Sequence, residues 1–307
     1  MTLRIGITGG GSTVDRIIDQ AAEAENDGFT SLWYGGGGRG MDVLTLLPLV
    51  GRATSRIELG TAIVQTYPRH PILMAQQAAT VAHAIGGGRL TLGVGVSHRP
   101  VIEASYGLSY DTNARHLHEY LTVLGALLRD GTVRFSGEEY RAASDLGVPV
   151  DPPVPVLAAA LASKSLRSAG ELADGTVLWM ANRDAIEGLI APTLREAAAS
   201  AGRPDPRIVA GLPVAVTDDV DAGREAAARL FSLYGTLPNY QRVLATGGIT
   251  APADAAIVGP EDKVAGAIED LVAAGATDVW AAPFPVGDDR SESRRRTRAL
   301  LRELVGA

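Results

Sequence analysis

The chain has 307 residues, 46% of them apolar, and its 28 basic and 35 acidic side chains give a net charge of −7. Nucleic acid and anionic membranes are not expected partners, because proteins that bind phosphate-rich surfaces carry the opposite charge balance. The absence of cysteine excludes disulfides, thiolate nucleophiles and cysteine-held zinc or iron–sulfur clusters.

Short β-rich runs alternate along the chain with longer stretches of helical periodicity. Most of these runs are apolar throughout, as expected of parallel strands that are covered on both faces. Eight strands are predicted: Arg4–Thr8, Ser31–Tyr34, Ile57–Val64, Leu90–Val96, Val154–Ala159, Thr176–Leu178, Ile208–Val216 and Thr277–Ala281. Their alternation with helices predicts an α/β fold, a (β/α)8 TIM barrel. A two-domain doubly wound protein is the alternative, but no linker marks a boundary, so one domain over residues 1–307 is expected.

Two stretches are longer than a minimal strand–helix unit. Val133–Tyr140 has the pattern of a small hairpin, and Leu233–Gly259 is long and irregular. Long loops inside compact domains are usually lids or binding loops. Both are therefore expected to be insertions around the C-terminal face, where barrels place their active sites.

Two glycine runs follow predicted strands, at Gly9–Gly11 and at Gly93–Gly95. Neither fits the G-x-G-x-x-G spacing of a dinucleotide fingerprint, because Val14 and His98 stand where the third glycine should be. The glycines either form tight strand-to-helix turns or bring backbone N–H groups close to a ligand phosphate.

The histidines do not predict a metal site. His116 and His118 are two residues apart, so on a helix their side chains point about 200° apart and cannot chelate one ion. His98 is different, because it directly follows the strand Leu90–Val96 at the end where barrels hold their chemistry. Its pKa range suits proton transfer, although a solvent-facing loop histidine is the other interpretation.

The stretch after the fifth strand, Leu161–Lys164, leads into a predicted helix at Ser165–Leu172. A helix N-terminus with small residues and a nearby lysine can bind an anion, although ordinary capping by Ser163 explains it equally well. Lys164 and Lys263 are the two lysines of the chain, and neither lies on a predicted strand. A Schiff-base aldolase is therefore not expected.

The segment Ile57–Pro100 carries an ordered series of motifs, and other stretches agree with it. The motifs are Gly60-Thr61, Arg69-His70-Pro71, Gln76–Thr80, Gly87-Gly88-Arg89 and Gly93-x-Gly95, joined by Glu23–Trp33, Gly170–Gly175 and Ala273–Pro283. This pattern resembles the bacterial-luciferase-like superfamily, the luciferase-like monooxygenase class, whose members are flavin- or deazaflavin-dependent oxidoreductases. The run Gly93–His98, followed by Pro100 and Gly107–Tyr110, is typical of members that depend on coenzyme F420, an 8-hydroxy-5-deazaflavin.

The resemblance implies where a cofactor would bind. The third strand would end in a bulge with a non-prolyl cis peptide bond, here Ala62–Ile63, and Ile63 would lie behind the cofactor ring. The cofactor phosphate would lie against Val96, Ser97 and His98 and against Leu161, Ala162 and Ser163. Relatives often have Gly-Pro in place of Ala162-Ser163, so this chain departs from the pattern there.

The resemblance also implies the catalytic residue. His98 stands where other relatives carry an acidic catalytic residue, which makes it the expected catalytic group. The Asp-His or Glu-His pair that some relatives have after strand two is missing, because the stretch here is Gly35–Gly38. The open face of the ring is expected to be bounded by Trp33, Tyr34, this glycine loop, Trp179 and the Leu233–Gly259 segment, with core packing as the other interpretation of Trp179.

Taken together, the resemblance predicts hydride transfer between F420 and a small organic substrate. An FMN-dependent monooxygenase and a flavin-binding protein with little catalysis of its own are the alternatives. The helices Asp42–Ala53 and Ile72–Ile85 predict a two-fold homodimer, because the first is apolar on several faces and the second offers small residues for close approach. With no apolar run of about 18 residues and no leader pattern, the chain is expected to be cytoplasmic.

Overall fold

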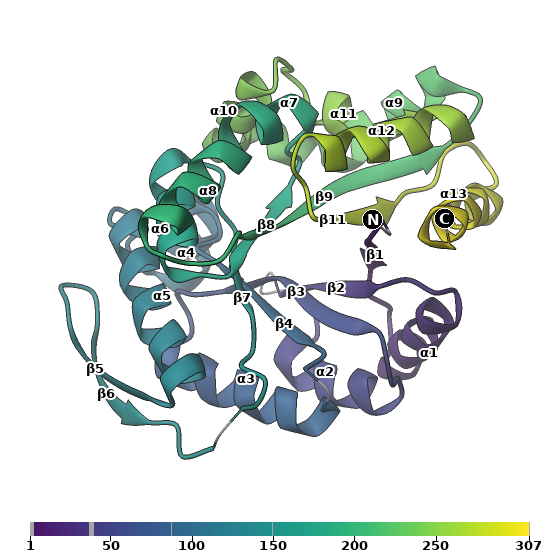
Figure 1. Cartoon of the computed structure of the whole chain (residues 1–307). Helices are drawn as coiled ribbons and strands as arrows, with labels where there is room; N and C mark the ends of the chain where they lie inside the picture. The colour runs from purple at the N-terminus through teal and green to yellow at the C-terminus, as the bar shows by residue number, and fades with distance from the viewer. Residues whose placement is uncertain (1–2, 37–39, 87, 149, 307) are drawn as a thin grey trace.

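A computed structural model describes residues 3–36, 40–86, 88–148 and 150–306 (Figure 1). Eight parallel strands close into a ring in which each strand pairs with two neighbours, and the ring joins β8 to β9. These strands are β1 (Ile5–Thr8), β2 (Ser31–Gly36), β3 (Glu58–Gln65), β4 (Leu90–Gly95), β7 (Val156–Ala158), β8 (Gly175–Trp179), β9 (Arg207–Val216) and β11 (Asp278–Pro283). The predicted (β/α)8 barrel and all eight of its predicted strands are confirmed.

Helices surround the barrel and bury one face each against it. The helices that follow the eight strands are α1 (Val14–Asn26), α2 (Val43–Arg52), α3 (Pro71–Ile85), α5 (Asn113–Asp130), α6 (Ser163–Leu172), α8 (Ala191–Ser200), α12 (Glu261–Ala273) and α13 (Arg290–Gly306). In α1, for example, Ile17, Ala21 and Ala24 recur at helical spacing and are all buried, and Thr13 caps the helix by accepting from the Arg16 N–H. No helix within the described ranges is long and apolar enough to cross a membrane.

The N-terminal end of the barrel is closed by charged side chains. Arg207 donates to Glu58 at 2.7 Å and to Asp278 at 2.6 Å, and Arg4 bonds the same two carboxylates. Asp278 is 2% exposed, so its charge is taken out of water and depends on these partners. Burial raises the pKa of Asp278, but hydrogen bonds from Arg207 and the attraction of its charge leave that pKa below the ordinary value. This network fixes the strands β3, β9 and β11 and the residue just before β1 to one another.

The predicted hairpin is present and longer than expected, as β5 (Thr132–Ser136) paired with β6 (Arg141–Asp145). It lies in the connection from α5 to β7, projects beside α5 (Figure 1), and turns back along that helix. The Glu119 carboxylate of α5 accepts the backbone N–H groups of Glu138, Glu139 and Tyr140, each at 2.9 Å. One buried carboxylate on α5 therefore fixes the turn of the hairpin.

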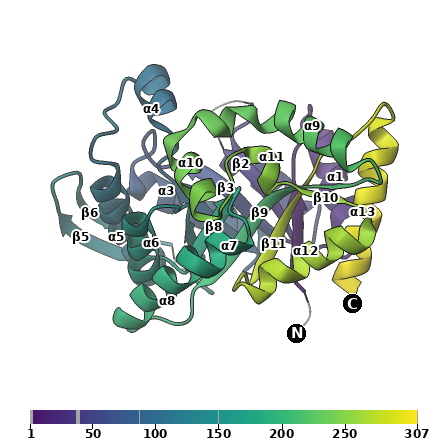
Figure 2. The same cartoon turned by 90° about the horizontal axis from the view of Figure 1, so that it is seen from above.

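The segment 233–259 was expected to be irregular, and that expectation is wrong. It forms the end of a 3-10 turn (Ser232–Thr236), two helices, α10 (Pro238–Thr246) and α11 (Pro252–Ala255), and a short strand, β10 (Ile257–Gly259). Pro238 and Pro252 each take the first position of a helix, where a missing N–H costs nothing. With α9 (Val220–Phe231), these helices lie along one side of the barrel in Figure 2, and β10 extends the sheet beside β9. The chain adds α4 (Arg99–Tyr106) after β4, and α7 (Arg183–Ala185) with a π-helical turn (Ile186–Ile190) after β8.

Candidate active site

The end of β3 is irregular, as expected. The Ala62–Ile63 peptide bond is cis, so this prediction is confirmed. Between Gly60 and Val64 the strand advances four residues while its partner β4 advances three, which is a bulge. Ala62 and Ile63 are both half-buried, although Thr61 and Val64 on either side are buried. The bulge therefore places two consecutive apolar side chains where a ligand can reach them.

The glycines of β4 make this bulge possible. The Thr61 hydroxyl donates to the Gly93 carbonyl at 2.7 Å and accepts the Gly93 N–H at 2.8 Å, so a side chain replaces the ladder bonds at the bulge. A Cβ on Gly93 would lie 1.9 Å from the Thr61 carbonyl oxygen, and a Cβ on Gly95 would lie 3.2 Å from the Ile63 side chain. The packing therefore explains these glycines by the close approach of β3 and β4, which is neither of the two interpretations of this run.

The turn after β4 presents backbone donors. Ser97 has a φ of 60°. His98 is the N-cap of α4, but its side chain makes no hydrogen bond that caps the helix. The backbone N–H groups of Ser97 and His98 find no acceptor among the described residues. Val96, Ser97 and His98 are all half-buried, so these donors lie where water or a ligand can meet them.

A second uncapped helix begins beside the first. α6 starts at Ser163, two residues before the predicted position, and its N-cap is Ala162, which has no side chain to cap it. Capping by Ser163, the other interpretation of this stretch, is therefore wrong. Ala162 and Ser163 are exposed, and Leu161 is half-buried. Because β7 pairs with β4, the helix N-termini that follow these two strands lie at neighbouring positions of the rim, and both carry free N–H groups and a positive dipole end.

A row of aromatic rings runs along this end of the barrel. His98 contacts Tyr240 of α10 at 5.6 Å between ring centroids, Tyr240 contacts Tyr234 at 4.9 Å, and Tyr234 contacts Trp179 at 6.0 Å. Trp179 in turn lies 5.0 Å from Trp280 of β11. Burial lowers the pKa of His98, so its imidazole is neutral at neutral pH. The row joins the insertion after β9 to the predicted site, and half-buried Trp179 packs against the core as well as lying at this rim.

Two residues expected at the open face are elsewhere. Trp33 is fully buried inside the barrel, where its indole N–H donates to Ser31 and its ring lies 5.8 Å from the Arg207 guanidinium. Tyr34, the next residue of the strand, points the opposite way into the helix layer and is 2% exposed. The expectation that they bound the cofactor is wrong. The strand was predicted to end at Tyr34 but continues to Gly36, so Trp33 and Tyr34 lie within it and not at the rim. Residues 37–39 of the glycine loop lie outside the described residues.

The other histidine of interest is part of the core. His116 is 4% exposed, shares a hydrogen bond of 2.9 Å with Thr66 and one of 3.3 Å with the Tyr140 hydroxyl, and stacks on Tyr67 at 3.8 Å. Burial lowers its pKa to about 4. His118 lies 3.2 Å from the Ser168 hydroxyl. Among the described residues no three His, Cys, Asp or Glu side chains converge to hold a metal ion.

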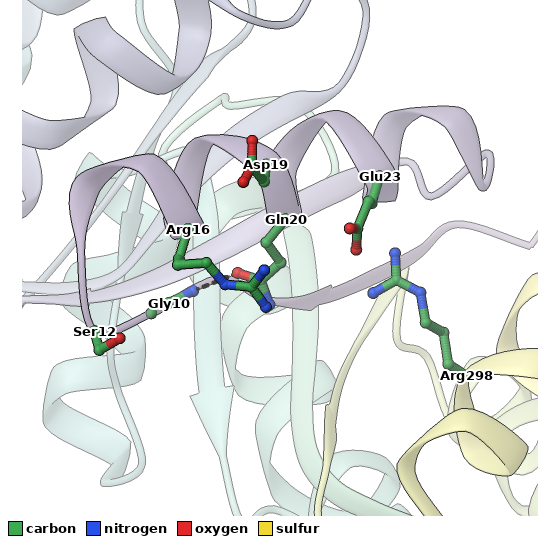
Figure 3. Close-up of a pocket in the computed structure, with 8 residues that line it drawn as sticks. Gly10, Ser12, Arg16, Asp19, Gln20, Glu23 and Arg298 are labelled. Atoms are coloured by element: carbon green, nitrogen blue, oxygen red, sulfur yellow. Dashed lines mark hydrogen bonds between the residues drawn. The ribbon is translucent and has the colours of Figure 1, made fainter. Parts of the chain in front are cut away.

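The molecule also has a hollow of about 370 Å3 away from this site. It lies between α1 and α13, and Figure 3 shows Arg16, Asp19 and Glu23 of α1 on one side and Arg298 on the other. Its charges are mixed. Gly10 and Gly11 of the first glycine run line it, but none of the residues expected to bind the cofactor or to act in catalysis does. The Gln20 side chain in this hollow accepts the Gly10 N–H at 2.8 Å and thereby fixes the loop after β1.

The barrel with a bulged third strand and two open helix N-termini defines a luciferase-like TIM-barrel protein. Residues 2–278 match the model of the family described as luciferase-like monooxygenase. The chain belongs to this family.

Individual relatives agree with that assignment. The chain is 30% identical over 223 residues to an F420-dependent glucose-6-phosphate dehydrogenase of Nakamurella multipartita, covering 68% of this chain and 65% of the relative. Its fold is similar to that of a coenzyme F420-dependent tetrahydromethanopterin reductase from Methanopyrus kandleri, with a TM-score of 0.80, 23% identity and coverage of 97% and 98% of the two chains. It is also similar to an oxygenating type II Baeyer–Villiger monooxygenase component of Pseudomonas putida in complex with FMN, with a TM-score of 0.75, 17% identity and coverage of 99% and 98%.

Proposed function

We propose that this protein transfers a hydride between coenzyme F420 and a small organic substrate. The observation that carries the proposal is the pair of uncapped helix N-termini, α4 and α6, beside the bulge at Ala62–Ile63. Backbone N–H groups and helix dipoles favour a phosphate at such a place. Relatives named F420-dependent enzymes support the deazaflavin.

The chain's own residues fit such a cofactor. Val96, Ser97 and His98 would bind its phosphate from one side, and Leu161, Ala162 and Ser163 from the other. Ile63 would press on one face of the ring with Ala62 beside it, because Gly95 leaves room for the Ile63 side chain. Trp179 would close the opposite side. A bound deazaflavin supplies a ring carbon that accepts or donates a hydride.

His98 is the proposed catalytic residue. Its pKa is lowered by burial, so the neutral imidazole can take a proton from a substrate hydroxyl, and in the reverse direction its protonated form returns that proton. Tyr240 packs against its ring and limits its access to water. His98→Ala is expected to lower kcat about 100-fold with little change in cofactor affinity, and normal turnover by this variant would contradict the role.

A second candidate keeps the site and changes the cofactor. The similarity in fold to an FMN-bound monooxygenase favours FMN and oxygen as the alternative. The test is titration of the purified protein with F420 and with FMN, followed by anaerobic turnover of the reduced cofactor with a substrate panel. A lower dissociation constant for F420 and anaerobic turnover support our proposal. Tighter FMN binding with oxygen-dependent turnover supports the monooxygenase, and tight binding with no turnover supports a flavin-binding protein.

We further propose a homodimer through α2 and α3. Leu49 of α2 and Leu73 of α3 are 49% and 47% exposed, and the two helices pack against each other. A two-fold contact would cover both side chains. Light scattering at micromolar concentration is expected to give twice the mass of the chain, and Leu49→Arg with Leu73→Arg to give the monomer. A monomeric wild-type protein would contradict this.

A further inference from the structure

The turn after β4 is held by three side chains that the proposed function does not use. Gln65, at the end of β3, is 3% exposed and donates from Nε2 to the Ser97 Oγ at 2.9 Å. The Tyr106 hydroxyl donates to the Gln65 Oε1 at 2.9 Å. The Tyr110 hydroxyl donates to the Ser97 carbonyl at 2.8 Å. Ser97 is therefore bound through both its side chain and its backbone.

Ser97 needs this support because of its conformation. Its φ of 60° is in the left-handed region, which residues with a Cβ adopt at a cost. Such a conformation persists only where the surroundings hold it. Here it reverses the chain between β4 and α4 and leaves the N–H groups of Ser97 and His98 without an acceptor among the described residues.

We propose that Gln65 is a positioning residue that makes this site select the phosphorylated form of its cofactor. Acting through Ser97, it holds the turn so that the N–H groups at the start of α4 receive the phosphate. The neutral amide suits this place, because a carboxylate there would add a negative charge beside the bound anion. The inference rests on the proposed function and adds the residue that prepares its anion site.

The test compares cofactors with and without their phosphate. Dissociation constants are measured by fluorescence titration for F420 and FMN, and for their phosphate-free counterparts, 8-hydroxy-5-deazariboflavin and riboflavin. Gln65→Leu, which removes both hydrogen bonds at similar size, is expected to weaken binding of the phosphorylated forms about tenfold. Binding of the phosphate-free forms is expected to stay within about twofold of wild type. Tyr106→Phe, which removes one of the bonds to Gln65, is expected to give a smaller loss in the same direction.

A second variant separates positioning from general damage. Glycine adopts a positive φ without a steric penalty, so Ser97→Gly in the Gln65→Leu background is expected to restore part of the lost affinity. Should Gln65→Leu not fold, Gln65→Asn, which keeps the amide but cannot reach Ser97, takes its place. Equal losses for phosphorylated and phosphate-free ligands, or no loss for either, would overturn the inference and leave the proposed function intact. A wild-type protein that binds none of the four ligands would overturn the proposed function, and this inference with it.

Discussion

The two ends of the barrel use polar groups in opposite ways. At the N-terminal end, Arg4 and Arg207 lie between Glu58 and Asp278, and the two carboxylates bond to both arginines. At the C-terminal end, the backbone N–H groups of the turn after β4 have no acceptor among the described residues. The first end uses its polar groups to hold the strands together, and the second leaves them available for a ligand. Changes at the two ends should therefore affect different measurements.

The largest effect is expected at the charged end. Arg207→Met should destabilise the protein by about 3–4 kcal/mol, because the buried Asp278 and the half-buried Glu58 would keep their charges with Arg4 as their remaining charged partner. Urea unfolding measures the loss. Arg183→Met is the matched control, because Arg183 pairs at the surface with Asp184 and Glu187 and should cost less than about 1 kcal/mol. Equal losses for the two variants would contradict the role of the charge network.

The next effect is a pH dependence of stability that comes from the buried His116 of α5. Because burial lowers the pKa of His116 to about 4 from an ordinary 6.5, the unfolded chain binds a proton between these values and the folded chain does not. The contribution of the neutral His116 to the free energy of unfolding should therefore be fully present above pH 6.5 and fall as the pH is lowered toward 4. The loss due to His116 should reach about 2 kcal/mol by pH 5.

His116→Gln should remove that part of the pH dependence. His98 and His70, whose pKa values burial also lowers, contribute with the same sign, so the difference between wild type and variant isolates His116. The measurement is Tm from pH 7 to pH 5. Parallel curves for the two proteins would show that His116 is not the group responsible.

The smallest effect on stability is expected at the open end, and it should have the opposite sign. Ala162→Asp supplies the cap that α6 lacks and should stabilise the cofactor-free protein by about 1 kcal/mol. The same carboxylate would compete for the N–H groups of α6 and repel a phosphate, so F420 affinity should fall about tenfold. Ala162→Ser, an uncharged cap, should reduce the affinity less. Unchanged or tighter binding of F420 by the Asp variant would show that α6 does not bind the phosphate.

The barrel could be predicted from the sequence, because each buried parallel strand is a local run of apolar residues that is followed by a helical pattern. It was not sufficient for features that depend on contacts between distant segments. The pairing of Arg207 with Glu58 joins residues 149 positions apart, and no local pattern marks it. The helices in 238–255 were missed because glycine and proline there indicated a loop, whereas each proline begins a helix.

The site could be predicted only in part, again because contacts between distant segments leave no local pattern in the sequence. The cis peptide bond at Ala62–Ile63 followed from the resemblance and is confirmed, and His98 lies at the end of β4 as its position predicted. The roles of the site residues remain predictions. Trp33 and Tyr34 were misplaced because the strand continues to Gly36 and alternates its side chains between the barrel interior and the helices. Tyr110 belongs to a motif of the resemblance, but Gln65 and Tyr106 gave no signal in the sequence. The convergence of these three side chains on Ser97 appears only in three dimensions.

A crystal structure with F420 bound tests the central claim most directly. The account predicts the phosphate at the N-termini of α4 and α6, within hydrogen-bond distance of backbone N–H groups of Ser97 and Ser163. It also predicts the deazaflavin ring against Ile63 with His98 facing the substrate side. A cofactor bound in the hollow between α1 and α13, or a phosphate held away from both helix N-termini, would contradict it.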